Sequence, residues 1–210
     1  MSVPVFITYR DRRSMLNRTV ASLFRCGFDD ITVIDNDSEI PLSPTGPNGI
    51  AILTDPMWGG GRSITVLKGD NSGRQLTPWL MNLVPDDSYY VVCDCDAELD
   101  PDCPTDIAEV LIDILERHPE IEKVGPGIRV DDLLFPPPDR YAYSYLMEYS
   151  IERGTRYGVI ERQMLNGVEV INAPIDTFWA MHRPGHGWPG IVGARTTAPY
   201  LARHLPWYNA

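Results

Sequence analysis

Apolar residues in the first part of the chain follow two spacings, one typical of strands and one typical of helices. Short runs rich in β-branched residues occupy positions 3–8 and 31–34, and polar residues follow each run. Between them, apolar residues recur at helical spacing over 14–24, and Gly27 supplies a residue type that commonly ends a helix. The pattern predicts a β-α-β unit with parallel strands, which places the tip after residue 8 beside the tip after residue 34.

The same spacing predicts further short elements along the chain. Residues 123–130 form a strand candidate interrupted by Gly-Pro-Gly, which predicts a bulge or an edge position. The aromatic segment 141–149 is predicted to pack as a helix, although it could also wall a groove for an acceptor. The other predicted strands are 50–53, 64–67 and 168–175, and the other predicted helices are 78–82 and 106–117.

The stretch 89–101, Tyr-Tyr-Val-Val-Cys-Asp-Cys-Asp-Ala-Glu-Leu-Asp-Pro, predicts a buried strand of an α/β sheet that ends in acids. Ligands of such sheets bind just outside the carboxyl ends of the strands. Because strand side chains alternate, we expect Asp94 and Asp96 on one face and Cys93 and Cys95 on the other. Neighbouring carboxylates favour a cation, and hard oxygen ligands suit Mg²⁺ or Mn²⁺. The alternative is a solvated acidic turn.

Composition limits the classes of protein that fit. With 210 residues, 43% of them hydrophobic, the chain can bury a sizeable core and is predicted to form a single domain, 1–210. A net charge of −11 argues against nucleic acid as a partner. We find no apolar run long enough for a transmembrane segment and no signal-peptide pattern after Met1, so a cytoplasmic protein is expected. The four cysteines lack a C-x-x-C arrangement and are predicted to be reduced core thiols, with structural zinc as the alternative.

The order of these motifs resembles the family-2-like glycosyltransferases of the GT-A group. Asp94-Cys95-Asp96 is similar to the Asp-x-Asp motif that holds a divalent ion against the diphosphate of a nucleotide-sugar. The opening, with a strand ending in Thr-Tyr-Arg, a helix and then Val-Ile-Asp-Asn-Asp-Ser, is similar too, as is the tail over 202–208. The resemblance implies an α/β fold with one GT-A (Rossmann-like) domain, a central, mostly parallel sheet and helices on both faces. It assigns 1–100 to nucleotide binding and 101–210 to the acceptor and catalysis.

The resemblance also implies roles for particular residues. Thr8 and Tyr9 would line the nucleoside pocket, and Asp35 would accept a hydrogen bond from the base or ribose, unless Asp35 is only a turn residue. The implied nucleotide-binding residues are Thr8, Tyr9, Arg10, Asp35, Asn71, Gly73 and Asp94.

The metal and the catalytic base are implied in the same way. Asp94 and Asp96 would bind Mn²⁺ or Mg²⁺, with His204 as a further ligand, unless His204 is a surface or hydrogen-bonded residue. Asp176 would be the catalytic base of an inverting reaction, with Asp131 and Asp132 as the competing carboxylates.

The implied activity is metal-dependent transfer of a sugar from a nucleotide-sugar, a UDP-sugar by the resemblance, to a hydroxyl of an unidentified glycan, lipid-linked or protein acceptor. Two alternatives remain open. One is a non-catalytic module that binds a nucleotide-sugar or a carbohydrate. The other is a sugar nucleotidyltransferase, which would need a Gly-rich phosphate loop after the first strand, where this chain has Thr-Tyr-Arg-Asp over 8–11.

Overall fold

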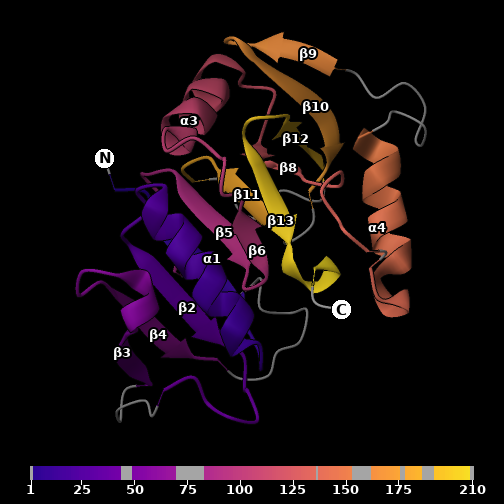
Figure 1. The fold of residues 1–210 in the computed structure, drawn as a ribbon. Coiled ribbons are helices and arrows are strands. Elements are labelled where there is room, and N and C mark those ends of the chain that lie inside the picture. Colours follow the sequence, from indigo (N-terminus) through magenta and orange to yellow (C-terminus); the bar gives the residue numbers. More distant parts are fainter. Residues whose placement is uncertain are drawn as a thin grey trace.

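The computed structural model describes residues 2–43, 49–69, 83–135, 137–152, 162–175, 178–185 and 192–208. Within these residues, the strands form one sheet of ten and one sheet of three. Figure 1 shows how the strands and helices are arranged. The predicted helix over 78–82 lies outside the described residues. No helix in the described part of the chain is both long and apolar enough to cross a membrane.

The strands and helices have the following bounds. In the first half the strands are β1 (Val5–Tyr9), β2 (Ile31–Asp35), β3 (Ile50–Thr54), β4 (Ser63–Lys68), β5 (Tyr90–Asp94) and β6 (Ala97–Leu99). In the second half they are β7 (Lys123–Gly125), β8 (Gly127–Ile128), β9 (Arg162–Leu165), β10 (Val168–Pro174), β11 (Trp179–His182), β12 (Val192–Thr196) and β13 (Leu201–His204). The described helices are α1 (Arg13–Arg25), α3 (Ile107–Arg117), α4 (Asp139–Glu152) and the 3-10 turns η1 (Pro56–Trp58) and η3 (Leu205–Trp207).

The β-α-β prediction is confirmed. Strands β4, β2, β1 and β5 are neighbours in that order and all run parallel. Tyr9 at the end of β1 lies opposite Asp35 at the end of β2, and Thr8 lies opposite Asp94 of β5. Helix α1 crosses one face of these strands (Figure 1) and ends before Gly27, whose φ of 84° is readily adopted by glycine. The polar ends of three parallel strands therefore meet at one edge.

The expectation of a mostly parallel sheet with helices on both faces is wrong. The large sheet has the order β3-β4-β2-β1-β5-β11-β7-β12-β10-β9, and five of its nine neighbouring pairs are antiparallel. The described residues contain three α-helices, too few for a Rossmann-like α/β layer arrangement. One physical cause is local: β9 and β10 are joined by Asn166 and Gly167, with φ of 52° and 85°. A two-residue Asn-Gly turn favours an antiparallel hairpin.

The expected edge position of the Gly-Pro-Gly segment holds for β8, an edge strand of the small sheet, but not for β7. β7 lies between β11 and β12 in the large sheet, whereas β8 pairs with β13 in the small sheet. Pro126 separates them and has no N–H to donate to either ladder. The chain therefore passes from one sheet to the other at this point.

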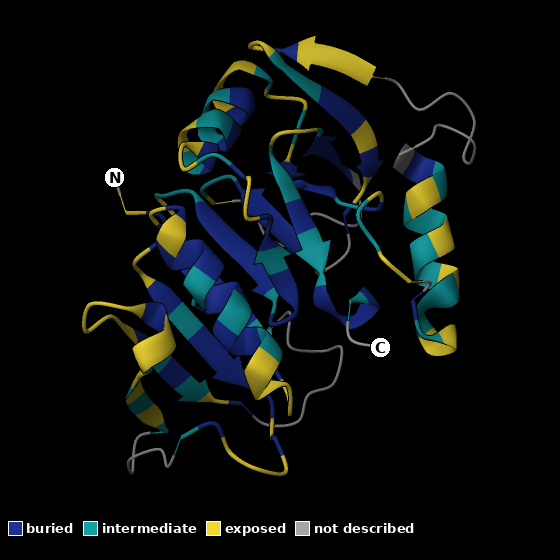
Figure 2. Cartoon of the chain, in the orientation of Figure 1, coloured by how far each residue is buried: buried dark blue, intermediate teal, exposed yellow. Residues whose placement is uncertain are grey.

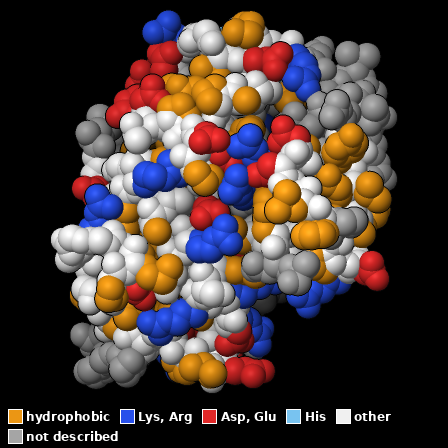
Figure 3. Space-filling model, viewed as in Figure 1, with side chains coloured by type: hydrophobic (Ala, Val, Ile, Leu, Met, Phe, Trp, Pro, Cys, Tyr) orange, Lys and Arg blue, Asp and Glu red, His pale blue; other side chains and the backbone are white. Residues whose placement is uncertain are grey.

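Burial follows the sheets. Figure 2 shows the strands beside α1 almost wholly buried, while α4 presents exposed positions to solvent. The four cysteines are free and buried, which confirms them as core thiols. Hydrophobic side chains gather on the surface over α4 (Figure 3), where Tyr143 and Leu146 are more than half exposed.

His182, at the end of β11, is expected to make stability depend on acid. Its ring stacks on Tyr90 with centroids 5.0 Å apart, and burial, followed by the charge of Lys123, lowers its pKa to about 3. The unfolded chain takes up this proton near pH 6.5 and the folded chain does not, so His182 favours folding above pH 6.5 and loses that contribution as the pH falls toward 3. We expect a loss on the order of 1 kcal/mol per pH unit within that window.

Urea unfolding at pH 7, 6 and 5 checks this expectation. His182→Gln removes the titrating ring and should flatten the pH dependence of the free energy of unfolding relative to the parent. His118→Gln, which alters a histidine that contacts Glu120 at 3.2 Å, is the comparison for loss of a histidine elsewhere in the fold, and the flattening should be larger in His182→Gln. Parallel slopes for the parent and His182→Gln would contradict the prediction.

Candidate functional site

The tips of β1 and β2 are joined by hydrogen bonds. Asp35 is buried, its Oδ1 accepts from the Ser38 N–H at 3.1 Å, and its Oδ2 accepts from the Leu42 N–H at 2.8 Å. Asp11, with a φ of 52°, accepts from the Glu39 N–H at 2.9 Å. Asp35 therefore shapes the loop after β2.

A cavity of ≈ 310 Å³ lies against these tips. Tyr9 lines it, and burial, followed by the charge of Asp35, raises the pKa of the Tyr9 hydroxyl, which stays a neutral donor. The volume lies at the lower end of the roughly 300–1,000 Å³ typical of small-molecule pockets. The lining residues are Tyr9, Asp11, Arg13, Glu39, Ile40, Pro41 and Leu42.

The two carboxylates of the Asp-x-Asp motif have different surroundings. Asp94, at the end of β5, accepts a hydrogen bond from the Thr8 hydroxyl at 2.8 Å, which connects it to β1. Strand β5 ends at Asp94, so Cys95 and Asp96 lie in the turn before β6 and the strict alternation stops there. Burial, followed by the charges of Asp96 and Asp94, raises the pKa of the Cys95 thiol to about 12. Cys95 therefore stays protonated.

Asp96 is 3% exposed, and two cationic or potentially cationic side chains of the described structure approach it. The guanidinium of Arg12 forms an ion pair with Asp96 Oδ2, and His204 Nε2 lies 4.0 Å from the same oxygen. The chain after β13 turns back here, because the Leu205 N–H donates to the Asp96 carbonyl at 2.9 Å. Asp96 and His204 are thus held together by backbone as well as by side chains.

Aromatic rings enclose His204. The ring centroids of Trp207, Phe178 and Tyr141 lie 4.8, 5.7 and 6.1 Å from the imidazole centroid. Burial lowers the pKa of His204, while the charge of Asp96 acts in the opposite direction. The imidazole is therefore neutral at neutral pH, and its buried Nδ1 has no hydrogen-bond partner among the described residues.

Asp96 and His204 fit a divalent ion in chemistry and in spacing. A carboxylate and a neutral imidazole are both ligands for Mn²⁺, and two ligands each ~2.1 Å from one ion can lie at most ~4.2 Å apart. In the part of the chain that the structure describes, no group of three or more His, Cys, Asp or Glu side chains could hold a metal. Ions of this type often take their other ligands from substrate phosphates and water.

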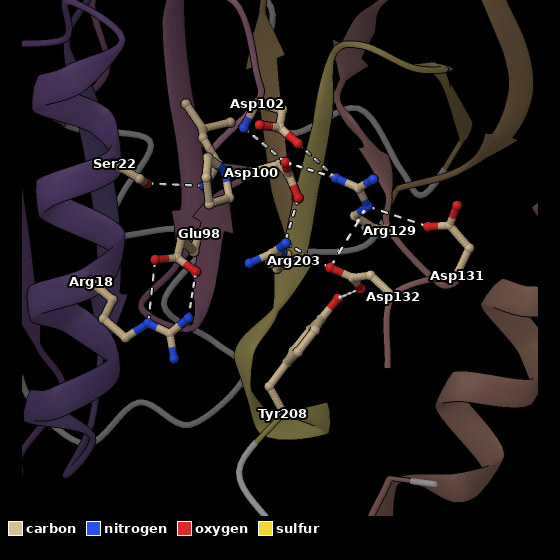
Figure 4. Close-up of polar contacts among 12 residues, drawn as sticks. Arg18, Ser22, Glu98, Asp100, Asp102, Arg129, Asp131, Asp132, Arg203 and Tyr208 are labelled. Atoms are coloured by element: carbon tan, nitrogen blue, oxygen red, sulfur yellow. Dashed lines mark hydrogen bonds and ion pairs between the residues drawn. The ribbon is translucent and has the colours of Figure 1, made fainter. Parts of the chain in front are cut away.

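A charged network fixes β13, whose last residue is His204 (Figure 4). Buried Asp100 accepts from Arg129 at 2.9 Å and lies 2.9 Å from Arg203 of β13. Asp132 accepts from Arg203 at 2.6 Å and from the Tyr208 hydroxyl at 2.6 Å. The hydrogen bond to Asp100 raises the pKa of Arg129, so the network remains charged. Because Asp132 accepts hydrogen bonds from both Arg203 and Tyr208, its carboxylate is already engaged as an acceptor.

The structure brings together some of the predicted site residues. Thr8 contacts Asp94, Tyr9 lies beside Asp35, and Asp96 lies beside His204. Arg10 is exposed, with its Nε 3.8 Å from Asp11. Asn71, Gly73 and Asp176 lie outside the described residues.

Two features of the site were missed from the sequence. One is the ion pair between Arg12 and Asp96, although Arg12 belongs to the polar cluster that follows the first strand. The other is the aromatic enclosure of His204 by Tyr141 and Phe178, which come from distant segments. The sequence signal for the ion pair was the position of Arg12 directly after a strand tip. The sequence signal for the aromatic enclosure was the spacing of aromatic residues over 141–149.

Comparison with known proteins adds no relative. No protein-family model matches the sequence, and no curated protein is significantly similar to it.

Proposed function

We propose that this protein is a metal-dependent glycosyltransferase that moves a sugar from a nucleotide-sugar to a hydroxyl acceptor. The observation that supports this best is the pair of buried Asp96 and partly buried His204 next to the strand tips that border the cavity of Tyr9. A nucleotide-sugar has a nucleoside, a diphosphate and a sugar in a row. The cavity suits the nucleoside, and the acid-histidine pair suits an ion on the diphosphate.

Each residue has a role in this proposal. Tyr9 and the loop shaped by Asp35 would hold the nucleoside, and Asp96, His204 and Asp94 would hold Mn²⁺ or Mg²⁺. The bound ion would act as a Lewis acid that offsets charge on the departing diphosphate. Asp176 would take the proton from the acceptor hydroxyl.

A second hollow suits the acceptor. It has a volume of ≈ 490 Å³ and borders β8 and β13, the strand that ends in His204. Two ion pairs face it, Arg129 with Asp131 at 3.3 Å and Arg162 with Glu169 at 2.9 Å. These side chains and a threonine hydroxyl can donate to and accept from the hydroxyls of a sugar. Because each positive charge is paired with a negative one, the hollow does not favour a charged ligand over a neutral one. The lining residues are Ile128, Arg129, Val130, Asp131, Arg162, Glu169, Thr197, Ala198 and Leu201.

Asp96→Asn is expected to weaken the Mn²⁺-dependent part of nucleotide affinity by about 10²-fold. Mutating a residue that only hydrogen-bonds to a metal ligand already costs ~10–100-fold in metal affinity, so mutating a ligand itself should cost an amount at the upper end of that range. Asn keeps the shape of the buried side chain, so the fold should persist. Calorimetric titration of UDP, GDP and dTDP with and without Mn²⁺ measures the effect.

The matched control is Asp102→Asn. Asp102 carries the same charge on a side chain that is 86% exposed and lies beyond β6. It should leave both the affinity and its dependence on Mn²⁺ unchanged. Unaltered Mn²⁺-dependent binding in Asp96→Asn, or an equal loss in both variants, would rule out Asp96 as a ligand.

A non-catalytic binding module is the second candidate, since the cavity and the acid-histidine pair would serve it equally well. Turnover separates the two functions. A transferase releases nucleoside diphosphate from the nucleotide-sugar, to an acceptor or slowly to water, whereas a binding module shows Mn²⁺-dependent affinity with no release. A thermal-shift screen of nucleotide-sugars with and without Mn²⁺ identifies the donor first, because a ligand of the native state raises apparent stability.

A further inference from the structure

The ion pair between Arg12 and Asp96 places a cation where the proposed metal would bind. Asp96 is a buried carboxylate, and a buried charge without a counter-ion is costly. Arg12 supplies that counter-ion by direct contact with Asp96 Oδ2, the oxygen that lies 4.0 Å from His204 Nε2. A metal ion at this oxygen would have to displace the guanidinium.

Arg12 is also placed to reach a diphosphate. Its neighbours in the chain, Asp11 and Arg13, line the cavity of Tyr9, while Arg12 turns to Asp96. Arg12 thus lies at the junction between the cavity and the pair of Asp96 and His204. A diphosphate that connects a nucleoside in the cavity to an ion at Asp96 would pass this junction.

The side chain of Arg12 has freedom to move, although its backbone is fixed. The Leu16 N–H donates to the Arg12 carbonyl at 2.9 Å, which makes Arg12 the N-cap of α1. The side chain itself is 45% exposed. Its guanidinium can therefore leave Asp96 by changes of side-chain torsions alone.

We propose that Arg12 exchanges partners, binding Asp96 in the metal-free protein and the diphosphate of the donor in the loaded protein. This assignment rests on the proposed glycosyltransferase function. A bound ion would neutralise Asp96 in place of the Arg12 guanidinium, and the guanidinium would then be able to donate to two phosphate oxygens at once. The first turn of α1, which Arg12 precedes, contains no acidic residue and so favours an anion there, whereas Asp11 and Glu39 contribute negative charge to the lining of the cavity.

The test separates the two partners by measuring metal and nucleotide binding independently. In Arg12→Gln, affinity for Mn²⁺ alone should rise by about tenfold, because the competing cation is gone. Affinity for UDP, GDP or dTDP at saturating Mn²⁺ should fall by roughly 10–100-fold, because a charge-assisted contact with the diphosphate is lost. Opposite changes in one variant are the signature of an exchanged partner, since a structural ion pair would move both affinities the same way.

Two further variants complete the design. Arg12→Lys keeps a positive charge next to Asp96, so Mn²⁺ affinity should stay near the parent's. It loses the planar guanidinium that can donate to two phosphate oxygens at once, so nucleotide affinity should fall severalfold. This variant also tests the proposal if Arg12→Gln does not fold. Arg18→Gln lies on α1, the helix that follows Arg12, and breaks an ion pair with Glu98 of β6 at 2.6 Å; it should change neither affinity.

The outcomes are distinguishable. A parent that binds Mn²⁺ and a nucleoside diphosphate, together with Arg12 variants that leave both affinities unchanged or lower both, overturns the role of Arg12 alone. Equal shifts in Arg18→Gln also overturn it, because the effect would then be one of net charge. A parent that binds neither ligand overturns the proposed function and the Arg12 role with it.

Discussion

Replacing Asp176 by Asn is expected to slow the release of nucleoside diphosphate from the donor by about 10²–10⁴-fold and to leave nucleotide affinity almost unchanged. A general base acts in the transition state, so its loss lowers turnover more than binding. Asp176 follows Ile175, whose carbonyl accepts from the buried Lys123 ammonium at 2.7 Å. It precedes Phe178 by two residues, and the Phe178 carbonyl accepts from the Asp94 N–H at 3.0 Å.

The controls for this prediction are the two competing carboxylates. Asp132 is held by Arg203 and Tyr208, and Asp131 is 67% exposed and paired with Arg129, so neither is free to act as a fixed base. Asp131→Asn is the cleaner control, since it removes an equal charge without breaking the contacts of Asp132. Because Asp131 borders the proposed acceptor hollow, the variant is compared at saturating acceptor, where it should keep turnover within severalfold of the parent.

The measurement pairs steady-state release of nucleoside diphosphate with NMR of the product anomer. An inverting reaction with Asp176 as base gives a product of inverted configuration. Near-normal turnover in Asp176→Asn, or a product of retained configuration, would show that the base has been misassigned.

Gly125→Ala is expected to lower the free energy of unfolding by about 3 kcal/mol, at the upper end of the usual cost of overpacking. A Cβ at this position would lie 2.3 Å from the Trp179 carbonyl oxygen, which is backbone and cannot rotate away. Trp179 is fully buried, and β11 pairs with β5 on one side and β7 on the other. Relieving the overlap would require two paired strands to separate.

Gly27→Ala is the matched control. A Cβ at Gly27 meets nothing within 4 Å, so the only cost is the φ of 84°, expected to be about 1 kcal/mol. Urea denaturation of the parent and both variants gives the comparison. The overlap argument would be contradicted if both variants lost the same free energy of unfolding, or if Gly125→Ala lost less than Gly27→Ala.

Local patterns in the sequence were enough to predict the first half of the large sheet. The apolar spacing over 14–24 and the runs on either side determine β1, α1 and β2, and the parallel crossover follows from them. One strong local signal was missed: Asn166-Gly167 between two short runs predicts a hairpin, and its omission contributed to the wrong expectation of a mostly parallel sheet. The short strand β6, three residues long, gives too little periodicity to be recognised.

The candidate site was only partly predictable, for a different reason. Asp94 and Asp96 were identifiable because they follow an apolar run, but what each one contacts depends on residues far away in the chain. Arg12 and His204 reach Asp96 from sequence separations of 84 and 108 residues, counted from the numbering of each pair. No local pattern specifies such contacts, since they arise from how α1 and β13 pack. The contact of Thr8 with Asp94, in contrast, follows from two neighbouring parallel strands.

The position of β13 in the small sheet has a consequence for the order in which the protein assembles during synthesis. β13 lies between β6 and β8 in this sheet. β6 leaves the ribosome about a hundred residues before β13, and β8 about seventy residues before it. Until β13 emerges, β6 and β8 have no ladder partner in this sheet, and Asp100 lacks Arg203. The parallel strands around β1 can form well before that. Asp96 therefore acquires His204 at a late stage, and a nascent chain can contain the folded cavity of Tyr9 before it contains the acid-histidine pair.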